Sequence, residues 1–394
     1  MKSLRFLLPF LLFATAFAER APDASKLAGI PKRMQELVDK GVISGSVTLV
    51  AKDGKVVQLA AVGKGDLATG REMKPDDLFW IASMTKPMTA ICVLMLQDEG
   101  KLRIEDPVEK HLPEFKGQWV VTEFGEKRCV LEKSPRPVTI RDLLTHTSGL
   151  GDVKSPRPHS TLGELCMAYS REPLFFAPGA KWNYSNSGIN TLGRIVEVVS
   201  GQPFAEFIQQ RLFTPLGMKD TTFWPAAEQQ ARIAKSYKPG KDGRLEETAN
   251  FFVTGDLADR RRTPSPAGGL YSTAADVARV YFMMLNGGTL DGHTYLKKDT
   301  ATLMTVTQTG DIKTGFVDGM SWGLGFQVVK EPQGVTAALS AGSFGHGGAY
   351  ATQSWGDPKR GAVYVMMIQR AGFPNGDASE ARKTFQDAAA AALP

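Results

Sequence analysis

Hydrophobic and polar residues alternate in short segments near the two ends of the chain. Residues 45–50 and 56–62 alternate around a turn at 52–54, a strong signal for a β-hairpin. Further strands are expected in apolar runs near the C-terminus, at residues 324–329, 349–354 and 362–368. Strands are therefore predicted at both ends of the chain.

Helical spacing of apolar residues dominates the middle of the chain and both termini. Helices are predicted over residues 25–41, 84–98, 139–145, 162–169, 190–199 and 379–392, and after the N-cap Thr273. Because strands and helices do not alternate regularly, a Rossmann or barrel fold is disfavoured. We predict an α+β fold, an antiparallel sheet flanked by helices, with a mostly helical domain inserted. The expected boundaries are 22–104 and 271–394 for the sheet domain and 105–270 for the insert, with a hairpin excursion at 117–137.

The first eighteen residues have the pattern of an export signal. Lys2 and Arg5 precede an apolar run, and Ala16-Phe17-Ala18 fits a cleavage site. The run is too short to span a bilayer as a helix. We therefore expect a periplasmic or secreted protein without stable membrane insertion; an uncleaved anchor is the alternative.

Composition excludes several classes of protein. The 394 residues are 42% hydrophobic and 22% charged with a net charge of +6, which argues against disorder and gives no sign of nucleic-acid binding. Five scattered histidines and three cysteines lack metal-ligand spacing, so no metal is expected. Cys92 is predicted in the core, whereas Cys129 and Cys166 could pair after export.

The first candidate chemistry lies at Ser83 and Lys86, at the start of the predicted helix 84–98. Residues three apart share one helix face, so the ammonium can approach the hydroxyl. The helix N-terminus favours developing negative charge, and a desolvated lysine can remove the serine proton. The alternative is an N-capping serine with a surface lysine.

A second candidate segment contains Tyr184 and Asn186 and precedes the predicted helix 190–199. A nearby cation lowers the pKa of a tyrosine, which can then carry protons. Asn186 can hydrogen-bond both a substrate carbonyl and Lys86. The alternative is an ordinary turn with a helix N-cap.

A third candidate segment is glycine-rich and surrounds His346. Gly347 and Gly348 permit close approach of the backbone to a ligand. The N–H of Ala349 is a candidate oxyanion donor at a strand edge. The alternative is a glycine-rich bend with a structural histidine.

Together, Ser-x-x-Lys, Tyr-Ser-Asn and His-Gly-Gly in this order resemble the serine β-lactamase and penicillin-binding-protein superfamily. The chain resembles in particular class C β-lactamases, family VIII carboxylesterases and D-amino-acid peptidases, over about residues 25–390. Further similar stretches are residues 81–87, 143–150, 266–273 and 322–326. The resemblance implies a β-lactamase/transpeptidase-like fold.

The resemblance also implies roles for the candidate residues. Ser83 would form an acyl-enzyme, with Lys86 and Tyr184 as the general base. Asn186 would orient the substrate and the lysine, and the N–H groups of Ser83 and Ala349 would form the oxyanion hole. His146 is interpreted as structural, because the lysine and tyrosine already fill the role of base.

One departure from the family pattern bears on the substrate. Most β-lactamases begin the third motif with a lysine that holds the drug's carboxylate, whereas His346 is mostly neutral near pH 7. The literal sequence Lys313-Thr314-Gly315 is interpreted as a coincidental loop match. An apparent nucleophile elbow at 341–345 is rejected because a strand, not a helix, is expected to follow.

These features predict an exported serine hydrolase that acts on small esters and needs no cofactor. A β-lactamase or D-alanyl-peptide hydrolase is the first alternative, and a non-catalytic binding or sensor protein on the same fold is the second. The expected partner is a small-molecule substrate, with no nucleic acid. The sequence leaves the oligomeric state open.

Overall fold

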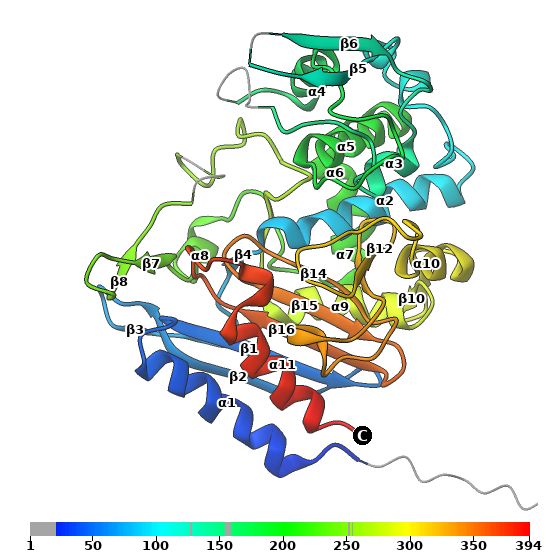
Figure 1. The fold of residues 1–394 in the computed structure, drawn as a ribbon. Helices are drawn as coiled ribbons and strands as arrows, with labels where there is room; N and C mark the ends of the chain where they lie inside the picture. Colours follow the sequence, from blue (N-terminus) through cyan, green and yellow to red (C-terminus); the bar gives the residue numbers. More distant parts are fainter. Residues whose placement is uncertain (1–20, 127, 154–158, 251–252, 254) are drawn as a thin grey trace, which may run out of the picture.

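An eight-stranded antiparallel sheet joins the two ends of the chain (Figure 1). The computed structural model describes residues 21–394 except 127, 154–158, 251–252 and 254. The strand order is β12-β13-β14-β15-β16-β1-β2-β3. The strands are β1 Gly45–Lys52, β2 Lys55–Asp66, β3 Arg71–Glu72, β12 Met320–Trp322, β13 Gln327–Val329, β14 Phe344–Gly347, β15 Gln353–Asp357 and β16 Ala362–Met367. The pairing of β1 with β16 confirms a sheet built from both ends.

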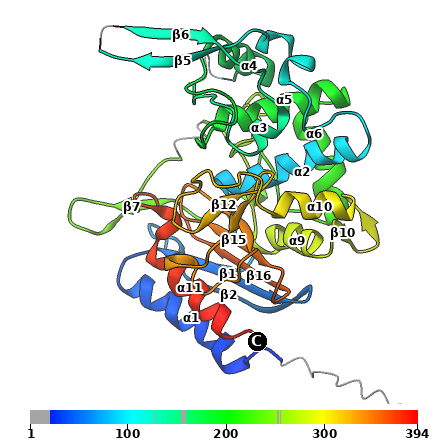
Figure 2. The same cartoon turned by 45° about the vertical axis from the view of Figure 1, so that its right-hand side comes forward.

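The two faces of the sheet bury different residues, because side chains alternate along each strand. Val47 and Leu49 face the larger core, which contains α2 (Thr85–Asp98) and α9 (Ala274–Leu285). Val50 and Tyr364 face α1 (Ala24–Asp39) and α11 (Glu380–Ala391), which pack together on the opposite face (Figures 1 and 2). Helices therefore cover both faces, as predicted.

Helix α2 lies between the sheet and the mostly helical part of the molecule (Figure 2). It is buried from Thr85 to Leu96, as expected for a helix with apolar residues on all sides, and it packs against α5 (Asn186–Ser200). The remaining helices are α3 Ile140–Leu144, α4 Leu162–Arg171, α6 Phe204–Ile208, α7 Thr214–Leu216, α8 Ala227–Gln230 and α10 Lys298–Thr305. Short helical turns are η1 Ala82–Met84, η2 Val108–Lys110, η3 Pro113–Phe115, η4 Gln209–Phe213, η5 Gly334–Thr336 and η6 Gly376–Ala378.

The predicted hairpin excursion is confirmed by β5 (Trp119–Phe124) and β6 (Cys129–Lys133), at the end of the helical part away from the sheet (Figure 1). Small strand pairs elsewhere are β4 Phe79–Trp80 with β9 Tyr271–Ser272, β7 Tyr237–Pro239 with β8 Leu245–Glu247, and β10 Thr289–Leu290 with β11 His293–Thr294. The domain boundaries at 104/105 and 270/271 stay a prediction.

The strand predicted over 349–354 is wrong for its first four residues, because β15 begins only at Gln353. The chain turns between β14 and β15, where the Gly348 N–H donates to the Thr352 carbonyl oxygen at 2.8 Å. Ala351 lies within this turn with a φ of 65°, a left-handed conformation outside the β region. The turn places the residues after Gly347 at the end of the sheet rather than inside it.

Two further expectations concern the cysteines and the N-terminus. Cys129 is an exposed free thiol and Cys166 a buried one, so the two form no disulfide, and Cys92 is buried as predicted. The predicted export signal at residues 1–18 lies outside the described residues. Over the part of the chain that is described, the helices are too short or too polar to cross a bilayer.

The ion pair between Arg71 and Asp77 yields a stability prediction. Asp77 is fully buried, and Arg71 Nη1 donates to both of its carboxylate oxygens, at 2.7 and 2.9 Å. Arg71→Ala would leave that carboxylate buried and unpaired, so unfolding free energy should fall by about 3–5 kcal/mol in denaturant titrations. Arg128→Ala removes an exposed pair with Glu123 and should cost about 0–1 kcal/mol. Equal losses in the two variants would contradict this account.

Candidate active site

Ser83 lies in η1, directly before α2, and is half-buried. The preceding residue, Ala82, has a φ of 45°, a left-handed conformation that costs energy for a residue with a Cβ. Neighbouring residues hold this segment in place. The Ile81 N–H donates to the Leu270 carbonyl, and the Trp80 indole donates to the Gly268 carbonyl at 2.7 Å. The serine is thus presented by a strained and tightly fixed turn.

Lys86 is fully buried, and its amine contacts three oxygen atoms. Nζ lies 3.0 Å from Ser83 Oγ, 2.8 Å from Asn186 Oδ1 and 2.6 Å from the Ala267 carbonyl oxygen. Burial lowers the pKa of Lys86 to about 7, and the negative charge of Asp152 opposes this shift. Near neutral pH, a substantial fraction of the lysine is therefore a neutral amine.

The three contacts fix where the lone pair of that neutral amine points. A neutral lysine has two N–H donors and one lone pair. The Ala267 carbonyl and the Asn186 Oδ1 can only accept, so they take the two N–H groups. The lone pair is left facing Ser83, whose hydroxyl can donate to it. This arrangement suits proton removal from the serine.

The Ala267 carbonyl was not anticipated from the sequence. It lies in the loop before β9, 181 residues after Lys86. Asn190 Oδ1 of α5 accepts the Ala267 N–H at 3.1 Å, and Thr89 Oγ1 of α2 donates to the adjacent Pro266 carbonyl at 2.8 Å. A main-chain acceptor leaves no residue-type signal in a sequence, which is why this partner was missed.

Tyr184 is brought to the same cluster, but its pKa shifts opposite to the sequence-based expectation. Lys86 Nζ lies 4.6 Å from the centre of the tyrosine ring, over its face. Burial raises the pKa of Tyr184 well above its usual value, and the neighbouring Ser83 hydroxyl offsets only part of that rise. Tyr184 Oη makes no hydrogen bond of good geometry with any described residue. Tyr184 is therefore a protonated phenol, suited to donate a proton.

Asn186 begins α5 and links Lys86 to a residue that the sequence did not single out. Its Oδ1 accepts from Lys86, while its Nδ2 donates to Asp152 Oδ2 at 2.7 Å. Asp152 follows the stretch 143–150, so its nearness in sequence to a recognised motif was the only available signal. The predicted contact between Asn186 and Lys86 is present.

The third motif lies beside the serine. A Cβ on Gly348 would come within 2.6 Å of the Ile81 carbonyl oxygen, so the close approach requires glycine here. His346 is buried, and its Nδ1 donates to the Gly347 carbonyl at 2.6 Å. Burial and the Lys86 charge lower the pKa of His346 to about 3, so it is neutral. Ala349 follows the end of β14, and its N–H meets no acceptor in the described chain.

Two other motifs lie where the sequence analysis expected them. Lys313 is 92% exposed and pairs with Asp318 on the surface, as expected for a coincidental match. His146 Nδ1 accepts the Ser185 N–H at 3.1 Å, so in the neutral ring Nε2 carries the proton. Burial lowers the pKa of His146 well below its usual value. His146 therefore anchors the Tyr184 loop, and its lowered pKa makes it a weaker base than an ordinary histidine.

Aromatic rings surround this cluster. Phe316 packs edge-on against Tyr184 and Trp182, with ring centres 5.0 and 5.7 Å apart, and remains 37% exposed. Trp322 packs against both His146 and His346. These rings give the site an apolar wall.

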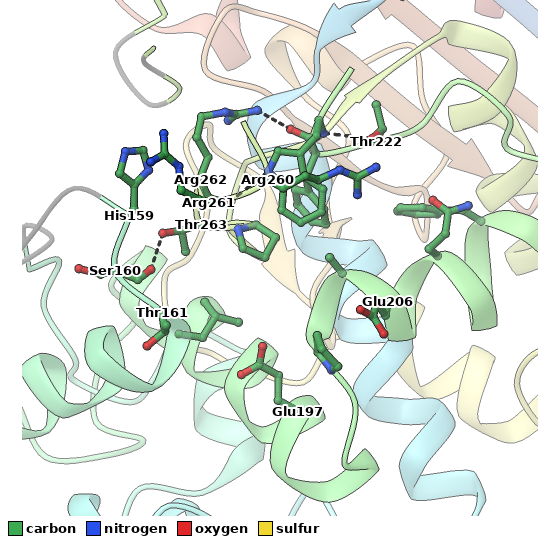
Figure 3. Close-up of a pocket in the computed structure, with 18 of the residues that line it drawn as sticks. His159, Ser160, Thr161, Glu197, Glu206, Thr222, Arg260, Arg261, Arg262 and Thr263 are labelled. Atoms are coloured by element: carbon green, nitrogen blue, oxygen red, sulfur yellow. Dashed lines mark hydrogen bonds between the residues drawn. The ribbon is translucent and has the colours of Figure 1, made fainter. Parts of the chain in front are cut away.

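A cavity of about 720 Å³ lies elsewhere, in the helical part (Figure 3). Arg260, Arg261 and Arg262 line it opposite Glu197 and Glu206 (Figure 3). None of the predicted site residues lines this cavity. It is therefore separate from the Ser83 cluster.

A half-buried serine whose hydroxyl faces a buried amine, on this fold, defines a serine hydrolase. A sequence model of the beta-lactamase family matches residues 30–389, and the chain belongs to that family. It is 32% identical over 373 residues to Protein Rv1367c of Mycobacterium tuberculosis, covering 87% of this chain and 90% of that protein. It is 30% identical over 386 residues to Esterase EstB of Burkholderia gladioli, covering 88% and 91%. The solved structure of EstCE1, a hydrolase with promiscuous acyltransferase activity, has the same fold, with a TM-score of 0.76 at 22% identity and coverage of 93% and 98%.

The lowered pKa of Lys86 predicts how Ser83 reactivity depends on pH. The amine loses its proton as pH rises through about 7, so the rate of Ser83 labelling by a fluorophosphonate probe should rise there and then level off. Mass spectrometry of quenched samples would give these rates. A rate that is unchanged from about pH 5 to about pH 9 would contradict a lysine base.

Proposed function

We propose that the protein hydrolyses small carboxylic esters through an acyl-enzyme on Ser83. The observation that supports this most directly is the buried Lys86 amine, which is held with its lone pair toward the Ser83 hydroxyl. The complete set of Ser83, Lys86, Tyr184 and Asn186 favours catalysis over a non-catalytic binding role, since a binding protein has no need of a buried base.

In the proposed acylation, Ser83 Oγ attacks the ester carbonyl and its proton passes to Lys86. The N–H groups of Ser83 and Ala349 stabilise the resulting oxyanion. As the carbon–oxygen bond to the alcohol breaks, the protonated Tyr184 gives its proton to the leaving oxygen and takes one from Lys86. Deacylation reverses these transfers, with water in place of the alcohol. Protons balance over the cycle.

The third motif supports a substrate without a carboxylate. His346 stands where most β-lactamases carry a lysine, and its pKa of about 3 keeps it uncharged. Lys313 cannot replace that charge, because it is on the surface and paired. The partly exposed Phe316 ring, which packs against Tyr184, suits an apolar acyl group. We therefore propose neutral esters with apolar acyl groups as substrates.

We further propose export to the periplasm or beyond, on the evidence of residues 1–18 alone. Within the family, we propose class C relatives as the nearest group, from the motif pattern around Ser83, Tyr184 and His346. We also propose that residues 105–270 form an inserted domain between the two sheet segments.

A panel of chromogenic p-nitrophenyl esters tests the proposed activity. The wild type should hydrolyse short and medium acyl chains, and Ser83→Ala should abolish turnover because no acyl-enzyme can form. Spectrophotometric rates at matched protein concentration give the result. Ester hydrolysis that persists in Ser83→Ala would overturn the mechanism.

The same panel should include nitrocefin and benzylpenicillin, which carry a carboxylate. We expect nitrocefin turnover at least about 10²-fold below the best ester, because no cation is available at the third motif. Nitrocefin turnover comparable to the esters would favour the β-lactamase alternative. A stable penicillin adduct on Ser83 would instead favour a D-alanyl-peptide hydrolase.

Lys86→Ala should lower kcat by about 10²–10⁴, the usual effect of removing a general base. Circular dichroism and thermal unfolding would check that the variant folds. Lys313→Ala is the matched control and should retain wild-type turnover, since Lys313 is exposed. A folded Lys86→Ala variant with normal kcat would contradict the role of the lysine.

A further inference from the structure

Asp152 makes three hydrogen bonds to the start of α5. Its Oδ1 accepts the N–H of Asn186 at 2.6 Å and that of Ser187 at 3.1 Å. Its Oδ2 accepts Nδ2 of the Asn186 side chain at 2.7 Å. Asp152 itself is exposed and does not contact Ser83 or Lys86 directly through any hydrogen bond in the described chain. Its hydrogen bonds therefore reach Lys86 only through Asn186, whereas its charge acts on Lys86 through space.

A carboxylate accepts hydrogen bonds and donates none, so the amide nitrogen of Asn186 must face Asp152. The amide oxygen then necessarily faces Lys86. If the amide rotated by half a turn, its NH₂ group would face the Lys86 amine. That NH₂ group would compete with the Ser83 hydroxyl for the lysine lone pair. The direction of one amide thus decides whether the lysine can act as a base.

We propose that Asp152 is a positioning residue that holds the Asn186 amide oxygen toward Lys86 and so keeps the lysine lone pair free for Ser83. The inference rests on the proposed acyl-enzyme chemistry and names a residue that sets it up. Asp152 also acts electrostatically, because its negative charge raises the pKa of Lys86.

A purely structural role would predict a different pattern of variants. Asp152 accepts two backbone N–H groups at a helix start, which is the work of a helix cap. Asparagine replaces aspartate well as a cap and alanine does not. If capping were all that Asp152 did, Asp152→Asn would therefore be milder than Asp152→Ala in every measurement.

The positioning role predicts the opposite order for catalysis. In Asp152→Asn, the carbonyl oxygen of the new amide keeps the backbone N–H bonds, and its NH₂ group then faces the NH₂ group of Asn186. This donor–donor contact is relieved when the Asn186 amide rotates and turns its nitrogen toward Lys86. In Asp152→Ala, the amide stays free to adopt the productive direction.

The experiment compares kcat on a p-nitrophenyl ester and the rate of Ser83 labelling by a fluorophosphonate for the two variants and the wild type. We expect a loss of about 10²-fold in Asp152→Asn and about 10-fold or less in Asp152→Ala. Thermal unfolding should show the reverse order, with Asp152→Ala the less stable. In both variants, the rise in labelling rate should move to lower pH than in wild type, because the charge that raises the Lys86 pKa is gone.

Asp23 provides the matched control. It is an exposed carboxylate that accepts the N–H groups of Ser25 and Lys26 at the start of α1, on the far side of the sheet (Figure 1). Asp23→Asn and Asp23→Ala should change stability in the order that capping predicts, with kcat and labelling unchanged.

A double variant that exchanges the aspartate and the asparagine tests whether activity can be rescued. In the combined variant Asp152→Asn and Asn186→Asp, one carboxylate oxygen at position 186 faces Lys86 again. The other oxygen accepts from the new amide nitrogen at position 152. The rate of Ser83 labelling should be at least about 10-fold higher than in Asp152→Asn. The rate should rise at a higher pH, because the carboxylate beside Lys86 raises the pKa of the lysine. Absence of recovery would count against the positioning role.

Each result separates the inference from the proposed function. Labelling in the expected order without ester hydrolysis by the wild type would support the positioning role and overturn the ester proposal. A loss of kcat and labelling rate in Asp152→Asn that is no larger than the loss in Asp152→Ala would overturn the positioning role, whatever the substrate. A wild type that the probe does not label would overturn both.

Discussion

The side-chain amine of Lys86 is fully buried, and it hydrogen-bonds to the nearby Ser83 hydroxyl and to two acceptors from distant parts of the chain. Burying a cation is costly, so the environment lowers the pKa of the lysine until the neutral amine competes with the ammonium near pH 7. The same contacts align the amine with Ser83. One buried group therefore joins α2, the start of α5 and the loop before β9, and it is the base in the mechanism that we propose.

The fold places each partner of this amine on a rigid element. The sheet brings β14 against the serine turn, where only a glycine at position 348 permits the close approach. Helix α5 carries Asn186 at its start, and Asp152 holds the amide in one direction from outside. His146 Nδ1 accepts the N–H of Ser185 and so fixes the loop that leads into α5. Proton transfer requires that the reacting atoms are held close to their productive positions. The residues that hold them here come from distant parts of the sequence.

Local patterns in the sequence predicted the features that depend on local physics. The hairpin of β1 and β2, the apolar helix α2 and the N-cap Thr273 were predicted from residue spacing and agree with the structure. Features that depend on tertiary contacts were missed. The Ala267 carbonyl carries no side-chain signal, and Ala351 gives no warning of a positive φ. The predicted direction of the Tyr184 pKa shift was wrong, because burial raises this pKa and the Ser83 hydroxyl offsets only part of the rise.

The central claim is that Lys86 is a neutral amine at the pH of catalysis. NMR titration of protein labelled with ¹³C at the lysine ε-carbons tests this directly, with the Lys86 signal assigned from its absence in Lys86→Ala. The account predicts that this one resonance titrates with a midpoint of about 7, while exposed lysines titrate near their ordinary value of about 10.4. A Lys86 signal that titrates together with the exposed lysines would contradict it.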